Sequence, residues 1–256
     1  MIKISNLSKK YGKNSVLKNI NYEIKQGTNY LIVGNNGSGK STLLKILLGI
    51  IKKYSGVVNI DEKPIGFFPQ DALVAKDIYV KDFFNLMNEL TEKEQKSLDK
   101  NALSKKFDCE HLLHKNFGKL SHGETKRVLL AATFMHDKYM LFDEPTNGLD
   151  AKYKKVFIEE IKKRYSEQNF IIATHDFDLI NELDFFIVTM KNGEFICELV
   201  KKEKQIFMRF LSNLDYDLRK HISKEKKIID GKEYFAIKQD VSLEEFIKKF
   251  INEDGG

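Results

Sequence analysis

The nine residues from Gly34 to Thr42, GNNGSGKST, carry the strongest chemical signal in the chain. They match the spacing G-x-x-x-x-G-K-[ST], a glycine-rich turn followed by a lysine and a hydroxyl residue. Glycines accept positive φ angles and carry no obstructing side chain, so successive backbone N–H groups can point into one concavity. Lys40 can then reach the β- and γ-phosphates of a nucleotide, and the Ser41 hydroxyl can bind Mg²⁺. The predicted phosphate-binding residues are Gly34, Asn35, Asn36, Gly37, Ser38, Gly39, Lys40, Ser41 and Thr42.

Two adjacent carboxylates, Asp143 and Glu144, directly follow the apolar run YMLF at 139–142. Mg²⁺ prefers oxygen ligands, so a carboxylate at the end of a buried strand suits it, and Asp143 is the expected metal ligand. Glu144 can orient the attacking water and accept its proton. Alternatively, the two acids only begin a turn at a strand end. The lysine of the upstream loop favours the catalytic interpretation.

The elements around these residues predict an α/β fold. An apolar strand at 30–33 precedes the glycine loop and an apolar helix at 43–51 follows it. Strand patterns also occur at 56–60, 65–68, 139–142, 170–174 and 185–190, and a helix pattern occupies 151–165. Alternating strands and helices predict a largely parallel sheet covered by helices. We further expect residues 19–33 to form a hairpin that turns at KQG.

Two other segments differ in character. Residues 71–119 have helical spacing and no convincing strand, which predicts a helical insertion. Residues 201–256 combine a strand pattern (QIFMRFL), the hairpin signal Asp230-Gly231 and an amphipathic helix at 242–251. We therefore expect one domain over 1–200 and a small α+β appendage over 201–256.

Composition excludes several classes of protein. The 256 residues include 43 Lys+Arg and 37 Asp+Glu, a formal net charge of +6, and the two cysteines cannot build a secreted disulfide framework. No apolar run reaches the roughly 18 residues of a membrane helix, and the N-terminus has no signal-peptide core. The mild charge is spread along the chain, so no direct nucleic-acid partner is expected. A reducing cytoplasmic location is the simplest interpretation.

Further motifs follow the glycine loop in a recognisable order. Gln70 lies in FFPQD, LSHGE spans 120–124, LFDEPTNGLD spans 141–150, and ATHD at 173–176 contains His175. Together they resemble the nucleotide-binding subunit of an ATP-binding cassette (ABC) ATPase over about residues 1–200. The resemblance implies a P-loop NTPase core with an antiparallel N-terminal β subdomain, Mg-dependent ATP hydrolysis, and ATP and Mg²⁺ as ligands.

The resemblance also assigns roles across a head-to-tail homodimer. ATP binds between the glycine loop of one copy and the LSHGE loop of the other, which involves Ser121 and Gly123. Gln70 senses the γ-phosphate and Mg²⁺, His175 contacts the γ-phosphate, and Tyr11 stacks on adenine.

Structural alternatives stay open for these residues. Ser121 with Glu124 is also a capping box, and Asp150 can cap the helix that follows it. Tyr11 can be a surface aromatic, Gln70 a polar residue that closes a strand, and His175 a structural histidine.

The sequence departs from the family pattern at His122, which replaces the second glycine of the signature loop, and at Glu124, which replaces glutamine. His122 places a bulky titratable side chain near the expected dimer interface.

Within this family we expect an exporter subunit, of the drug or peptide type because of the C-terminal appendage, bound at the inner face of the cell membrane through a separate permease. The region Phe67–Met87 would dock there, with Phe83 and Phe84 either against the permease or in the core of the insertion.

One alternative function is that of a soluble ABC-type ATPase acting on ribosomes or nucleic acid. The short spacing from Lys40 to Gln70 favours this alternative, and the single cassette without a charged linker opposes it. A further alternative is a degenerate nucleotide-binding module with little turnover.

Overall fold

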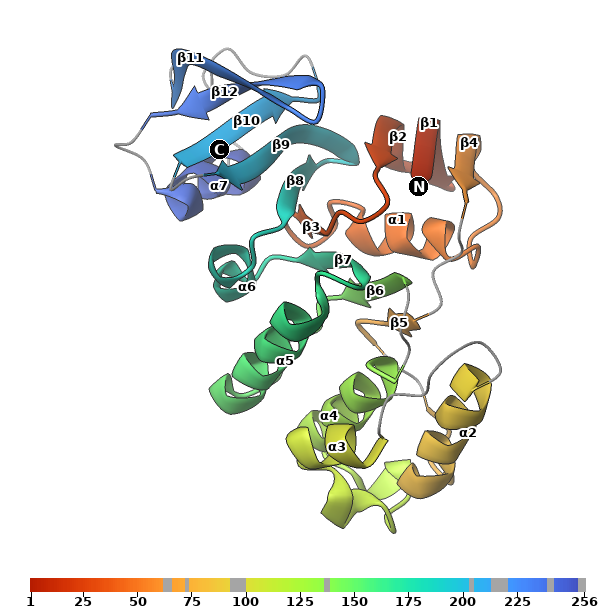
Figure 1. Cartoon of the computed structure of the whole chain (residues 1–256). Helices are drawn as coiled ribbons and strands as arrows, with labels where there is room; N and C mark the ends of the chain where they lie inside the picture. The colour runs from red at the N-terminus through yellow and green to blue at the C-terminus, as the bar shows by residue number, and fades with distance from the viewer. Residues whose placement is uncertain are drawn as a thin grey trace. The chain divides into compact units, whose positions relative to one another are not determined.

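The computed structural model describes residues 1–61, 66–71, 74–92, 100–135, 139–202, 205–212, 221–238 and 242–252 (Figure 1). The chain forms two compact units. The first combines Met1–Glu62 with Ile171–Gly256, and the second spans Lys63–Phe170.

A three-stranded antiparallel sheet opens the first unit. Its strands are β1 (Ile2–Tyr11), β2 (Asn14–Ile24) and β4 (Ser55–Ile60), in the order β2-β1-β4. Strand β1 buries Ile2, Ile4 and Leu7. Ile2 and Ile4 follow the period of two, and a register irregularity between Ile4 and Leu7 accounts for the three-residue step, so the strand keeps one apolar face as expected of a half-exposed antiparallel sheet. The antiparallel N-terminal subdomain implied by the family resemblance is confirmed.

The predicted hairpin over residues 19–33 is wrong. Ile24 of β2 pairs with Ile2 of β1, whereas β3 (Tyr30–Val33) pairs in parallel with two other strands of a different sheet. The reason is burial: all four β3 side chains are buried, so this strand needs cover on both faces. Such cover is available in the middle of a parallel sheet and not in a hairpin with one solvated face.

The larger sheet of the first unit places β3 between β7 (Asn169–Thr174) and β8 (Phe186–Lys191). Beyond β8 follow β9 (Glu194–Lys202), β10 (Gln205–Phe210), β12 (Lys232–Ile237) and β11 (Ile222–Ile229), all antiparallel to their neighbours. Among its described residues, this unit contains the helices α1 (Lys40–Leu47), α6 (Phe177–Glu182) and α7 (Leu243–Asn252). The α/β fold class is confirmed.

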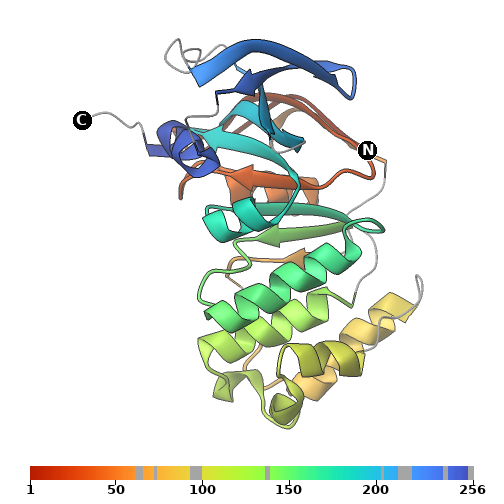
Figure 2. The same ribbon diagram turned by 60° about the vertical axis from the view of Figure 1, so that its left-hand side comes forward.

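The elements predicted after residue 200 all form. The QIFMRF strand is β10, and the hairpin β11–β12 turns at Asp230 and Gly231, which both have positive φ angles. Helix α7 begins with the predicted reciprocal cap between Ser242 and Glu245. Strand β10 pairs with β9 along six residue pairs, so the C-terminal strands continue the sheet of the first unit (Figure 2). The domain boundary at residue 200 stays a prediction.

The described residues of the second unit form two parallel strands and four helices. Strand β5 (Gly66–Phe68) pairs in parallel with β6 (Tyr139–Asp143). The helices are α2 (Val80–Glu92), α3 (Lys100–Lys106), α4 (His122–Thr133) and α5 (Ala151–Arg164), with 3₁₀ turns η1 (Glu110–Leu112) and η2 (Phe117–Lys119). The described residues of 71–119 are largely helical, as predicted, and contain one isolated bridge between Tyr79 and Asn116.

Helix α2 has one broad apolar face, of which one side is buried and the other is exposed. Val80 and Phe84 are buried, and Phe83 packs edge-on against Phe117 with ring centroids 5.2 Å apart. Phe84 is thus a core residue of the insertion, which was one of the two predicted alternatives, whereas Phe83 packs on Phe117 and stays partly exposed. Helix α2 nevertheless exposes Leu86 and Leu90, each about half exposed.

Candidate active site

The glycine loop connects β3 to α1 and depends on its glycines at defined places. Gly37 and Gly39 have φ angles of +83° and +111°, a region that L side chains rarely adopt. A Cβ on Gly34 would lie 2.3 Å from the carbonyl oxygen of Met190, and one on Gly39 would lie 2.8 Å from Cδ2 of Leu17. These two glycines therefore allow the loop to pass against β8 and β2 without a clash.

Lys40 is the first residue of α1 and its side chain is buried. Its Nζ donates to the carbonyl oxygens of Gly34, at 2.6 Å, and Asn35, at 3.2 Å. The ammonium group therefore folds back over the loop.

The start of α1 suits a phosphate group. Within the described residues no side chain caps this helix, its first turn contains no acid, and the buried Ser38 Oγ has no hydrogen-bond partner. Uncapped N–H groups at a positive helix end bind phosphate oxygens well. Ser41 and Thr42 are partly exposed in the first turn of α1, and Asn35 and Asn36 are exposed in the loop.

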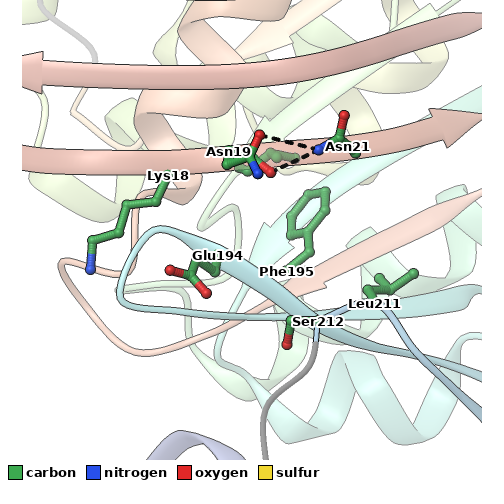
Figure 3. A pocket seen from close by; sticks show the side chains of 8 residues that line it. Lys18, Asn19, Asn21, Glu194, Phe195, Leu211 and Ser212 are labelled. Carbon is green, nitrogen blue, oxygen red and sulfur yellow. Dashed lines mark hydrogen bonds between the residues drawn. The ribbon is translucent and has the colours of Figure 1, made fainter.

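The turn between β8 and β9, at Asn192 and Gly193, binds the backbone of the glycine loop. The N–H of Gly193 donates to the carbonyl of Ser38, at 3.0 Å, and the carbonyl of Gly193 accepts from Lys18 N–H, at 2.9 Å. Next to this turn lies a polar cavity of about 310 Å³, where Asn19 and Asn21 face Phe195 across the gap (Figure 3). The residues that line this cavity do not include Gly34–Thr42, so the cavity is not the phosphate site.

His175 directly follows β7, and the β3–β7 register places it at the same edge of the sheet as the glycine loop. Val33 pairs with Thr174, so the residues after both strands lie at their common carboxyl end. Thr174 Oγ1 accepts the N–H of Asp176 at 2.9 Å, and Asp176 caps α6, which fixes the backbone on both sides of the exposed His175.

Tyr11 ends β1 with its side chain 48% exposed, and Lys9 Nζ lies 4.7 Å from its ring centroid. This exposure fits an adenine contact and a surface aromatic equally well.

In the second unit, Gln70 and the two carboxylates meet at one edge. Phe68 of β5 pairs with Phe142 of β6 in parallel, so the residues that follow each strand lie at the same carboxyl end. Asp143 and Glu144 are almost completely buried, whereas Gln70 is partly exposed. Carboxylate and amide oxygens are the donors that Mg²⁺ prefers, so this set fits the predicted metal role.

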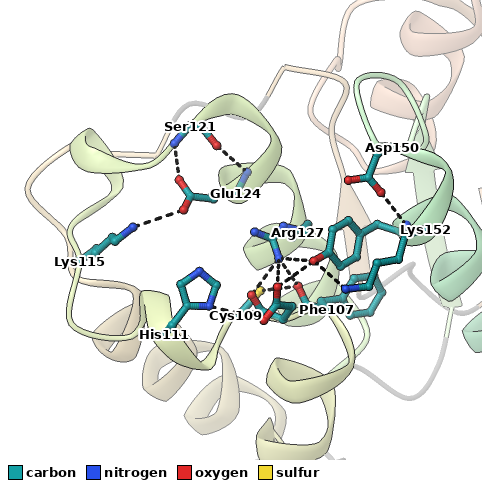
Figure 4. Close-up of polar contacts among 11 residues, drawn as sticks. Phe107, Cys109, His111, Lys115, Ser121, Glu124, Arg127, Asp150 and Lys152 are labelled. Carbon is teal, nitrogen blue, oxygen red and sulfur yellow. Dashed lines mark hydrogen bonds and ion pairs between the residues drawn. The ribbon is translucent and has the colours of Figure 1, made fainter.

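The LSHGE loop begins α4, and Ser121 caps its own helix (Figure 4). Ser121 Oγ accepts the N–H of Glu124 at 3.2 Å, and the Glu124 carboxylate accepts the N–H of Ser121 at 2.7 Å. This backbone hydrogen bond, assisted by Lys115, holds the pKa of Glu124 below its ordinary value. The capping alternative is therefore confirmed. A Cβ on Gly123 would meet no atom within 4 Å, so the backbone here is open to a ligand.

A network that the sequence did not indicate joins α4, α5 and the turn after α3. The Nη1 atom of Arg127 on α4 donates to the carbonyl of Asp108 at 2.8 Å and to the hydroxyl of Tyr153 at 2.9 Å (Figure 4). Tyr153 donates to the Asp108 carboxylate at 2.9 Å, and its backbone N–H donates to Asp150, the N-cap of α5. The cap by Asp150 follows from local spacing, but no spacing rule links Asp108, Arg127 and Tyr153, because these three meet only through tertiary packing.

The predicted site residues therefore form two sets. The first unit holds the glycine loop, Tyr11 and His175, and the second holds Gln70, Ser121, Gly123, Asp143 and Glu144.

Comparison with known proteins identifies the family to which a chain with these two sets of residues belongs. The family model described as "ABC transporter" matches residues 17–147. This chain is a member of the ABC transporter family. It is 31% identical to the zinc import ATP-binding protein ZnuC of Ehrlichia ruminantium over 83% of this chain and 90% of that protein. It is 32% identical to the zinc uptake system ATP-binding protein ZurA of Listeria monocytogenes, over 71% and 79%.

A solved structure agrees in fold. A dimeric bacterial ABC transporter cassette superposes with a TM-score of 0.66 and 24% identity, over 84% of this chain and the whole of that one. The chain is thus an ATP-binding subunit of an ABC transporter and a Mg-dependent ATPase. Among the described residues, no helix is long and apolar enough to cross a membrane.

Proposed function

We propose that two copies of this ABC subunit pair head to tail around ATP and energise a separate membrane permease. The observation that carries the proposal is the exposed side of the apolar face of α2, together with Tyr79 directly before the helix. Tyr79, Leu86 and Leu90 follow one another at helical spacing and are each about half exposed. A helix with apolar side chains on its outer face is suited to docking against a partner.

Each predicted site residue then has a role in hydrolysis. Lys40 and the N–H groups of its loop hold the β- and γ-phosphates, while Ser41, Asp143 and Gln70 hold Mg²⁺, which neutralises phosphate charge when bound. Glu144 orients water and takes its proton, and His175 contacts the γ-phosphate. Ser121 and Gly123 present the first turn of α4, where the backbone beside Gly123 is open, to the nucleotide of the other copy.

The direction of transport has two candidates. The strands and helix after residue 200 resemble appendages of drug and peptide exporters, which supports export. The names of the relatives from Ehrlichia and Listeria support uptake of zinc instead. Deleting the gene separates the two: uptake predicts lower cellular zinc, whereas export predicts unchanged zinc and greater sensitivity to a drug or peptide.

A fractionation experiment tests whether this subunit binds a membrane permease. Tagged Glu144→Gln is expressed in the native cell, trapped with Mg-ATP, and measured in the membrane and ribosome fractions. We expect enrichment on membranes together with a helical membrane protein. Leu86→Glu should lose this association, whereas Ile228→Glu, at a residue 67% exposed in the first unit, should keep it. Sedimentation with ribosomes and without membranes would overturn the proposal.

A further inference from the structure

A buried lysine joins helix α4 to the loop after β6. Lys126 is only 6% exposed, and its Nζ donates to the carbonyl oxygen of Asn147. A methyl group built on Gly148 would lie 3.4 Å from Cδ2 of the His122 ring and 4.0 Å from Nζ of Lys126. His122 and Lys126 are four residues apart, so one face of α4 lies against the loop at two consecutive positions, and Lys126 binds it.

This loop keeps Glu144 in an unusual backbone conformation. Glu144 has a φ angle of +50°, in the left-handed region that costs a residue with a Cβ about 1 kcal/mol or more. The loop turns tightly, with hydrogen bonds from Asn147 N–H to the Glu144 carbonyl, at 3.3 Å, and from Leu149 N–H to the Thr146 carbonyl, at 3.1 Å. Such strain persists only where neighbouring contacts impose it, and Lys126 binds the middle of this turn.

The charges around Lys126 come from the same edge of β5 and β6. Burial lowers the pKa of Lys126, while the negative charges of Asp71 and Glu144 act in the opposite direction. Asp71 adjoins Gln70, so the ammonium group lies in the field of both segments that carry the predicted magnesium and water-activating residues of this unit.

We propose that Lys126 is a positioning residue for ATP hydrolysis, which holds the loop of residues 144–150 so that the Glu144 carboxylate faces the attacking water. The inference rests on the proposed role of Glu144 as base. This role of Lys126 has a consequence for the dimer. Helix α4, whose first turn would meet the partner's nucleotide, is also fixed to the loop of residues 144–150 in its own chain. A shift of α4 on dimer closure is thereby passed to Glu144.

The test compares Lys126→Met with Lys126→Arg and with Lys155→Met, at an exposed lysine of α5 in the same unit. Turnover, ATP affinity and melting temperature are measured for each variant. We expect Lys126→Met to lower kcat about 10- to 100-fold, the range seen when reacting groups are slightly misplaced, with ATP affinity within about twofold of wild type. Lys126→Arg should recover most of the rate because a guanidinium can reach the same carbonyl.

A second comparison shows whether Lys126→Met lowers the rate only because it destabilises the fold. In single-turnover experiments, adding Lys126→Met to Glu144→Gln should leave the residual rate unchanged, because a positioning residue acts only through the group it positions. The inference is overturned if Lys126→Met turns over like Lys155→Met, or if it lowers the residual rate of Glu144→Gln by the same factor as in wild type. Wild-type turnover in Glu144→Gln itself would instead overturn the proposed base, and with it this inference.

Discussion

Replacing Glu198 by glutamine tests how the C-terminal strands are fastened to the nucleotide-binding half. Glu198 lies on β9 with 2% of its side chain exposed. Its carboxylate accepts hydrogen bonds from the hydroxyls of Tyr22 on β2 and Tyr234 on β12, and pairs with Arg209 of β10 at 3.2 Å. Burial, with the adjacent negative charge of Glu198, raises the pKa of Tyr22. One carboxylate thus joins strands from both ends of the chain.

The expected loss follows from these contacts. Removing one partner of a buried ion pair costs about 3 to 5 kcal/mol. Glutamine keeps the shape and one acceptor oxygen, and Arg209 is partly exposed, so we expect about 3 kcal/mol, the lower end of that range. For a chain of this length that corresponds to a fall in melting temperature of about 6 to 12 °C.

The assay is thermal unfolding followed by circular dichroism, with Glu233→Gln as the matched control. Glu233 lies on β12 with 46% of its side chain exposed, and its partner Lys226 is also exposed, so that exchange should change the melting temperature little. Equal melting temperatures for the two variants would contradict this prediction, because they would mean that the buried carboxylate contributes no more than a surface pair.

Three other predictions concern the predicted site and the second unit. Lys40→Ala should abolish tight ATP binding in a titration, since the phosphate charge loses its partner; unchanged affinity would exclude the role. Tyr153→Phe should lower the unfolding free energy by about 1 kcal/mol in urea, because its hydroxyl bonds a half-exposed carboxylate; Tyr165→Phe, at an exposed tyrosine, is the control. The pKa of Glu124 lies below its ordinary 4.5, so its cap stabilises α4 above that pH and is lost as pH falls through the lowered value. Glu124→Gln should reduce this acid sensitivity in pH-dependent melting, and an unchanged profile would contradict it.

The glycine loop and the strand-end carboxylates could be predicted from the sequence because their signals are local. The spacing of Gly34, Gly39 and Lys40 encodes one turn between one strand and one helix, and the structure builds that turn. The turns at Asn192-Gly193 and Asp230-Gly231 were equally predictable, since both residues of each pair take positive φ angles.

The remaining features depend on contacts between distant segments. Alternation in Ile20, Tyr22 and Ile24 identifies a strand but not its partner, and β2 pairs with an N-terminal strand that the sequence analysis did not identify. Lys126, Arg127 and Glu198 are ordinary charged residues in the sequence, and only their burial against distant chain segments distinguishes them. For Ser121 and Asp150, the local capping pattern was predictable, and its coexistence with a role at the dimer interface stays a prediction.

The mass of Glu144→Gln in solution tests the head-to-tail ATP-bound dimer most directly. It is measured with and without Mg-ATP by light scattering after size-exclusion chromatography. We expect a monomer without nucleotide and a dimer holding two ATP molecules with it, since the variant should bind ATP and barely hydrolyse it. The double variant with Lys40→Ala should stay monomeric under both conditions. A Glu144→Gln chain that binds ATP and remains a monomer at saturating Mg-ATP would contradict the head-to-tail mechanism.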